Sequence, residues 1–186
     1  MFIYSYIVLW IIISFLTFST IIVIRRITPA RPRLEMDDVG LDIGVKVPIT
    51  KFKSLVNKSV ELITPNKSGT VVVFLSINCG ACSNVIANLT NFIQQHSNLS
   101  VVVFMRGNDE NEIFMKLGNL TPDIPVIKLT DELQERFIVT LYPFAYFLSS
   151  TGTVLAKGGI PAGKPHLELL TSLGLSNKKV NKKVAA

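Results

Sequence analysis

Apolar residues are distributed unevenly along this chain of 186 residues. Residues 2–24 form one uncharged run, FIYSYIVLWIIISFLTFSTIIVI. Because about 20 apolar residues in a helix span a bilayer, the run predicts one N-terminal transmembrane helix. A cleaved signal peptide is the alternative, but no basic residue precedes the run and no A-x-A pattern follows it. We therefore expect an uncleaved anchor over residues 1–25.

Beyond the anchor, the spacing of apolar positions changes between strand and helix patterns. Residues 26–38 are rich in Pro and Arg and then acidic, which predicts a tether without its own core. Residues 70–77 and 100–105 are continuous β-branched runs, typical of strands buried on both faces. Between these runs, positions 85, 86, 89, 92 and 93 place apolar residues on one face of a helix from Cys79 to about residue 95.

The remaining pattern predicts shorter elements of both kinds. Strands are expected at residues 60–63 and 125–129, helices at 109–117, 131–139 and 165–173, and a hairpin of strands 144–148 and 153–157 that ends at Gly158-Gly159. From Asn177 the chain is polar and rich in Lys, which predicts a loose tail. This order of elements predicts an α/β domain built on a mixed sheet flanked by helices.

The formal net charge of +6 comes largely from two short segments. These are the arginines after the anchor and the lysines near the C-terminus: Arg25, Arg26, Arg31, Arg33, Lys178, Lys179, Lys182 and Lys183. Such segments fit attraction to anionic lipid headgroups. A nucleic-acid-binding domain would need a basic face interleaved with aromatic residues, and the pattern contains none, so no nucleic-acid partner is predicted.

The only two cysteines lie in the motif Cys79-Gly80-Ala81-Cys82, between the predicted strand and the predicted helix. A disulfide that closes so short a loop contributes little stability, because loop-closure stabilisation grows with loop length. At the first turn of a helix, however, unpaired backbone N–H groups and the helix dipole favour the thiolate that attacks disulfides. The second thiol, one turn further on, is close enough to resolve the mixed disulfide. The pair therefore favours redox chemistry.

Two other interpretations of the cysteines remain open, namely an inert buried pair and half of a metal site. A zinc site would need two further ligands, and the chain offers only His96 and His166, which lack ligand spacing. We predict no metal and no cofactor. Both histidines are expected at the surface, as is Lys157, which follows the hairpin.

The order of strand, CGAC, amphipathic helix, strand and a proline ahead of a hairpin resembles the thioredoxin superfamily. Within it, the chain is most similar to membrane-anchored, exported redoxins of the TlpA and MauD type. The similarity rests on the anchor, the CxxC motif, GLDIGVKVP (residues 40–48) and LYPFAYFLSSTGTVLAKGG (residues 141–159). The resemblance covers residues 40–175. It implies a thioredoxin-like domain over residues 39–175, followed by a basic flexible tail over residues 176–186.

The resemblance also implies roles for individual residues. Cys79 would be the exposed attacking cysteine and Cys82 the buried resolving one, with Gly80 and Ala81 between them as active-site support. Pro143 would be the cis-proline beside the disulfide, although only about 5% of X–Pro bonds are cis. Tyr142 would supply backbone that pairs with an extended substrate segment.

Three departures from the thioredoxin pattern leave the direction of electron flow open. Asn78 stands where thioredoxins have a tryptophan, and Val73 lies near the position of their buried acid. The dipeptide Gly80-Ala81 is neither the Gly-Pro of thioredoxin nor the Pro-His of strong oxidants.

The expected function is therefore a membrane-anchored thiol-disulfide oxidoreductase that acts on protein thiols or disulfides. A second protein in the membrane would restore its redox state, and residues 2–24 would contact lipid. The alternative is a membrane-tethered binding or assembly module with a thioredoxin fold and no obligatory turnover. The resemblance places the domain outside the cytoplasm, whereas Arg25, Arg26, Arg31 and Arg33 favour the cytoplasmic side, so charge alone leaves topology open.

Overall fold

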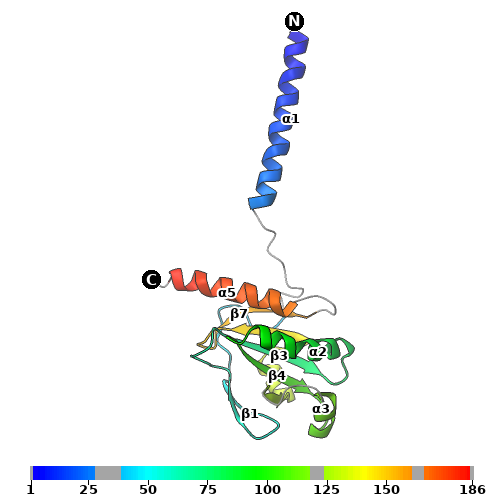
Figure 1. Cartoon of the computed structure of the whole chain (residues 1–186), viewed down its shortest axis with the longest axis vertical. Coiled ribbons are helices and arrows are strands. Elements are labelled where there is room, and N and C mark those ends of the chain that lie inside the picture. Colours follow the sequence, from blue (N-terminus) through cyan, green and yellow to red (C-terminus); the bar gives the residue numbers. More distant parts are fainter. Residues whose placement is uncertain (1, 28–38, 118–123, 161–165, 185–186) are drawn as a thin grey trace. The chain divides into compact units, whose positions relative to one another are not determined.

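The computed structural model of this chain describes residues 2–27, 39–117, 124–160 and 166–184. The chain divides into two compact units, Met1–Arg33 and Leu34–Ala186 (Figure 1). The first unit contains α1 (Phe2–Ile27), which confirms the predicted helix. Across the described ranges, however, no helix combines the length and apolar character that crossing a membrane requires. Residues 28–38 of the predicted tether lie outside the described residues.

The second unit is organised around a mixed five-stranded sheet, as the sequence predicted. Its strands lie in the order β5-β4-β3-β6-β7, with β3 parallel to β4, β4 parallel to β5, and β6 antiparallel to both β3 and β7. The bounds are β3 (Thr70–Ser76), β4 (Ser100–Arg106), β5 (Val126–Lys128), β6 (Phe144–Leu148) and β7 (Val154–Gly159). A separate antiparallel pair consists of β1 (Lys51–Lys53) and β2 (Ser59–Glu61).

Four helices complete the described part of the second unit, and Figure 1 shows how they lie around the sheet. They are α2 (Gly80–Gln95), α3 (Glu110–Leu117), α4 (Asp131–Arg136) and α5 (His166–Val184). The α4 helix begins at a side-chain cap, because Thr130 Oγ1 accepts a hydrogen bond from Leu133 N at 3.3 Å. The helix was predicted to reach residue 139, but it ends at Arg136. Two residues further on, Ile138 adopts a positive φ of 53°, which a helix does not allow.

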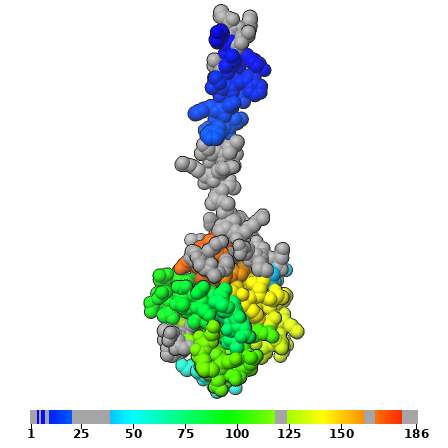
Figure 2. Space-filling view, turned by 90° about the vertical axis from the view of Figure 1, so that its right-hand side faces the viewer, coloured from blue at the N-terminus to red at the C-terminus, as the bar shows by residue number. Residues whose placement is uncertain are grey.

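Successive residues of β3 pack into two different cores, because side chains alternate between the faces of a strand. Val71, Val73 and Leu75 belong to a core shared with α2, α3 and α5. Val72 and Phe74 belong to a second core on the other face, which is rich in aromatic side chains. In the space-filling view, green side chains of the α2–α3 region adjoin yellow side chains from the C-terminal half of the second unit (Figure 2). Burial on both faces explains the continuous apolar run of the sequence.

The end of the chain differs from the prediction. The last helix, α5, continues to Val184, so the segment predicted as a loose tail is helical over residues 176–184. Two side chains near the start of this tail segment form hydrogen bonds with backbone carbonyls of the second unit. Asn177 Nδ2 donates to Leu155 O at 2.8 Å, and Lys178 Nζ donates to Ser68 O at 2.7 Å. These contacts let a polar, Lys-rich sequence continue as a helix. Likewise, Gly158 and Gly159 are not outside the hairpin but form the last two residues of β7 and pair with β6.

Candidate active site

The two cysteines form a disulfide at the junction of β3 and α2. Cys79 is the N-cap of α2, and its Sγ accepts a hydrogen bond from Cys82 N at 3.1 Å. The sulfur thus takes the place of an N-cap side chain, which accepts a hydrogen bond from one of the free N–H groups in the first turn of a helix. A negative charge on Cys79 Sγ in the reduced state is stabilised there by this N–H and by the helix dipole.

Burial distinguishes the two sulfur-bearing residues. Cys82 is completely buried, whereas Cys79 is partly exposed. Between them, Gly80 is exposed and Ala81 is half-buried, and a Cβ added at Gly80 would meet nothing within 4 Å. Solvent therefore reaches Cys79 but not Cys82, which is the burial pattern that the resemblance implied.

The segment before β6 completes the site. The Tyr142–Pro143 peptide bond is cis, which confirms the predicted geometry. Cys79 Sγ lies 3.6 Å from Tyr142 O, a distance at which a reduced thiol can donate a hydrogen bond to this carbonyl. Pro143 is buried, and its own carbonyl accepts from Ile160 N at 2.9 Å. The fold thus brings together Cys79 and Tyr142, which are 63 residues apart in the chain.

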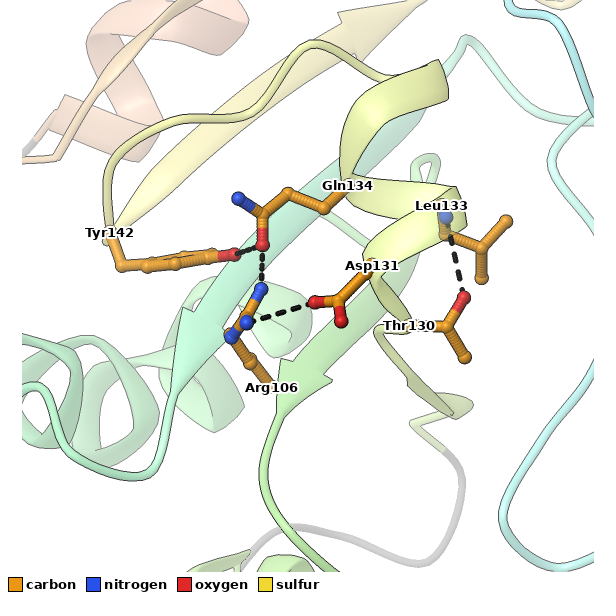
Figure 3. A network of polar contacts seen from close by, with 6 residues as sticks. All are labelled: Arg106, Thr130, Asp131, Leu133, Gln134 and Tyr142. Atoms are coloured by element: carbon orange, nitrogen blue, oxygen red, sulfur yellow. Dashed lines mark hydrogen bonds and ion pairs between the residues drawn. The ribbon is translucent and has the colours of Figure 1, made fainter.

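A polar network supports the Tyr142 side chain (Figure 3). Its hydroxyl donates to Gln134 Oε1 at 2.9 Å, and Arg106 Nη1 donates to the same oxygen. Arg106 Nη2 forms an ion pair with Asp131 Oδ1 at 2.9 Å. Burial raises the pKa of Tyr142 above its ordinary value of 10.0, Arg106 opposes this shift and Asp131 adds to it. The phenol is therefore neutral near pH 7 and available as a donor.

Sequence reasoning did not find this network. The available signal was the position of Arg106 at the end of β4, which pairs in parallel with β3 and sets Arg106 opposite Ser76. Carboxyl ends of parallel strands meet at one edge of a sheet, where sites of α/β proteins form. Arg106 is the last residue of β4 at this edge, and the CxxC motif comes shortly after the end of β3 at the same edge.

Two residues expected at the surface are buried instead. Lys157 is only 5% exposed, because residues before β1 cover β7: Gly44 N donates to Val154 O at 2.8 Å. Its Nζ donates to Gly40 O at 3.2 Å and lies 3.6 Å from Asp42 Oδ1. His166 is 8% exposed at the start of α5, while His96 is partly exposed. Over the described ranges, no group of three His, Cys, Asp or Glu side chains could hold a metal ion.

No protein-family model and no curated protein matches the chain by sequence. Solved structures do match it. A protein from Chlorobium tepidum described as a thiol:disulfide interchange protein, DsbE, has a TM-score of 0.62 and 20% identity, over 73% of this chain and 99% of that chain. The thioredoxin domain of a thiol-disulfide oxidoreductase from Bacteroides vulgatus has a TM-score of 0.59 and 14% identity, over 72% and 96%.

A third match is a secreted Mycobacterium tuberculosis disulfide oxidoreductase homologous to Escherichia coli DsbE. It has a TM-score of 0.55 and 15% identity, and the alignment covers 66% of this chain and 92% of that chain. The second unit thus has a thioredoxin-like α/β fold with a mixed sheet, which confirms this part of the predicted fold class, whereas the transmembrane helix that the prediction placed before it was not found in the described residues. It also carries the CxxC-spaced cysteine pair as a disulfide at the start of α2.

Proposed function

We propose that this protein is a thiol-disulfide oxidoreductase that exchanges disulfides with protein substrates through Cys79 and Cys82. The observation that carries the proposal is the disulfide at the N-cap of α2 with the Tyr142 carbonyl 3.6 Å from Cys79 Sγ. Little structural stability follows from a ring this small, whereas a partly exposed sulfur at a helix start is suited to attack.

In the reducing direction, the Cys79 thiolate attacks one sulfur of a substrate disulfide. The new Cys79–substrate S–S bond forms, the substrate disulfide breaks, and its leaving thiolate takes a proton from water. The Cys82 thiolate then attacks Cys79 Sγ, so that the intramolecular disulfide forms and the second substrate thiolate leaves. Two electrons have passed to the substrate. The reverse sequence oxidises a substrate dithiol, and a partner protein restores the starting state.

Tyr142 is proposed to contribute its backbone to substrate binding. It lies just outside the β6 ladder, whose pairing with β3 begins at Phe144, and its carbonyl faces Cys79. A substrate segment in extended form can pair with backbone that lies outside the strand pairs of the sheet. This pairing would place the substrate cysteine next to Cys79.

Substitution of each cysteine in the reduced full-length protein tests the proposed reaction. Cys79→Ser removes the attacking sulfur, so exchange with a disulfide-bonded protein substrate should be abolished. Cys82→Ser leaves the attack intact but prevents resolution, so a mixed disulfide with the substrate should accumulate on non-reducing gels. Full exchange by the Cys79→Ser protein would contradict the proposal and favour a binding or assembly module.

We also propose that the protein is a membrane-attached redoxin of the TlpA and MauD type, with the thioredoxin-like unit outside the cytoplasm and a redox partner in the membrane. Support comes from the uncharged run 2–24 and from the segments 40–48 and 141–159. An impermeant maleimide applied to intact, mildly reduced cells should label Cys79. Labelling only after lysis would place the unit in the cytoplasm, as the arginines after residue 24 favour.

The reduction potential decides the direction of electron flow. Equilibration of the protein with glutathione should give about −120 mV for a disulfide donor and about −230 mV or lower for a reductant. Either value is compatible with the exchange reaction, and failure to equilibrate would contradict it.

A further inference from the structure

A polar cleft lies at the carboxyl ends of β3, β4 and β5. Its volume is about 330 Å³, and its walls include Ser76, Asn78, Arg106, Lys128, Thr130 and Asp131. We call it the Asn78 cleft. Asn78 immediately precedes Cys79, so the wall of the cleft continues into the proposed attacking residue. A residue near the cysteine of a substrate bound covalently to Cys79 can therefore reach the cleft.

In the Asn78 cleft, the two cationic side chains have more N–H donors than the hydrogen bonds and ion pairs that they form with the protein. Arg106 and Lys128 supply eight N–H donors by their chemistry, five and three respectively. Arg106 makes one bond to Gln134 and one ion pair with Asp131. Lys128 Nζ donates to Asn108 O at 3.1 Å. With two cations and one carboxylate among the lining side chains, the cleft has a net positive charge and suits a ligand that is anionic and rich in acceptors.

Arg106 is held in place before any ligand arrives. Gln134 and Asp131 fix two sides of its guanidinium group, as the close-up shows (Figure 3). A side chain that is already ordered loses less conformational entropy on binding, so its remaining donors are available at lower cost. Gln134 also accepts from the Tyr142 hydroxyl at 2.9 Å, which connects the wall of the cleft to the segment that faces Cys79.

We infer that the Asn78 cleft is a subsite for an acidic side chain of the protein substrate, bound by Lys128 and Arg106 while the substrate disulfide lies at Cys79. The inference rests on the proposed exchange function and adds a substrate class to it. A carboxylate on a residue near the reactive cysteine of the substrate supplies the acceptors that the cleft lacks. Because the cleft is open to solvent and charged, the preference should weaken as salt screens it.

Disulfide-containing peptides that differ only at one position near the reactive cysteine test the subsite. The full-length protein is reduced and mixed with peptides that carry Glu, Gln or Lys at that position, on either side of the cysteine. At one position, the second-order rate constant of this single-turnover exchange should fall in the order Glu, Gln, Lys, by about tenfold from Glu to Lys, which corresponds to about 1.4 kcal/mol. In about 1 M salt the three values should converge.

Charge substitutions in the cleft provide the second arm. Lys128→Gln should reduce the preference for the Glu peptide over the Lys peptide, and Lys128→Glu should reverse it. Lys116→Gln is the matched control, because Lys116 is an exposed residue of α3 that does not line the cleft, and it should keep the preference of the unaltered protein. A preference that survives Lys128→Glu would overturn the inference.

Peptide affinity for the Cys79→Ser protein, measured by fluorescence anisotropy, separates binding from exchange. Tighter binding of the Glu peptide supports the subsite even if exchange fails, which would contradict only the proposed function. Equal binding and equal exchange of all three peptides would overturn the subsite and leave the function standing. Inhibition by inorganic phosphate beyond that by chloride at equal ionic strength, with no peptide preference, would assign the cleft to a free anion and also overturn the inference.

Discussion

At the residue scale, Tyr146 shows how one buried hydroxyl connects three segments. The side chain is fully buried in β6, and its hydroxyl donates to Phe137 O at 2.6 Å. The same oxygen accepts from Leu41 N at 2.8 Å. Burial raises the pKa of Tyr146 to about 12, although the hydrogen bond from Leu41 opposes the shift. The residue therefore links the segment before β1 and the end of α4 to the sheet, and the link to α4 requires the phenol to be protonated.

This raised pKa predicts an alkaline loss of stability. The folded state holds the phenolic proton more tightly than the unfolded chain, whose tyrosine pKa is about 10. The contribution is therefore fully present below about pH 10 and is lost as the pH rises through about 12. Its size is on the order of 3 kcal/mol, from two pKa units. Urea unfolding between about pH 8 and 12 should show a steeper decline for the unaltered protein than for Tyr146→Phe, which differs from it only in this hydroxyl.

The control value for this comparison is the stability near pH 7. There Tyr146→Phe should cost about 1–3 kcal/mol, because it leaves the buried Phe137 carbonyl and the Leu41 N–H without this partner. Parallel pH profiles for the two proteins would show that Tyr146 does not titrate in the way that its burial indicates.

At the element scale, the contact between α5 and β6 depends on a glycine. Gly174 is buried in α5, and a Cβ added there would meet the ring carbons Cγ and Cε1 of Phe147 at 2.5 and 2.9 Å. Phe147 is itself fully buried in the core shared with α2. The absence of a side chain thus allows α5 to approach the sheet closely.

Gly174→Ala should therefore destabilise the protein, although alanine is the better helix former. Helix propensity alone would favour alanine by about 1 kcal/mol. Overpacking against Phe147 costs about 1–3 kcal/mol and is expected to exceed that gain. Gly80→Ala is the matched control, because nothing lies within 4 Å of a Cβ at this exposed position. Urea unfolding should give a lower free energy of unfolding for Gly174→Ala and no loss for Gly80→Ala, and equal stability of both variants would contradict the packing argument.

The elements that the sequence predicted well are those with strong local signals. The central strands β3 and β4 follow from continuous β-branched runs, and α2 follows from its apolar stripe. The strand β1 was missed, because Lys51-Phe52-Lys53 is too short to show a pattern. The length of α5 was missed because its lysine-rich end is held by tertiary contacts, such as Lys178 Nζ to Ser68 O, and not by apolar periodicity.

The candidate site was likewise predictable only where its residues form a local sequence signal. The CxxC motif and the Tyr142-Pro143 dipeptide are local signals, and the cis bond confirmed the expectation. The Arg106–Gln134–Tyr142 network depends on the parallel register that sets Ser76 opposite Arg106, which single-sequence patterns do not encode. The burial of Lys157 depends similarly on the segment that packs over β7, with Gly40 and Asp42 as its partners.

At the scale of the whole molecule, the chain separates its properties between two units. The second unit, Leu34–Ala186, contains both hydrophobic cores and the disulfide. The first unit contains α1, whose described apolar side chains are largely exposed, with Ile11 at 63% and Phe15 at 72%. We therefore expect stability and disulfide exchange to be properties of the second unit, and lipid attachment to be a property of the first.

Removal of residues 1–33 tests this division. The shortened protein should keep the urea midpoint and the peptide exchange rate of the full chain, because it keeps both cores and the CxxC site. It should no longer sediment with vesicles of zwitterionic lipid. This lipid is chosen because it has no net charge and so does not attract the lysines of α5. The double variant Ile11→Lys and Phe15→Lys should lose sedimentation in the same way, since it places two charges among the exposed apolar side chains of α1 that would contact lipid. Sedimentation of the shortened protein would transfer lipid attachment to the second unit, and a lower urea midpoint would show that α1 stabilises the core.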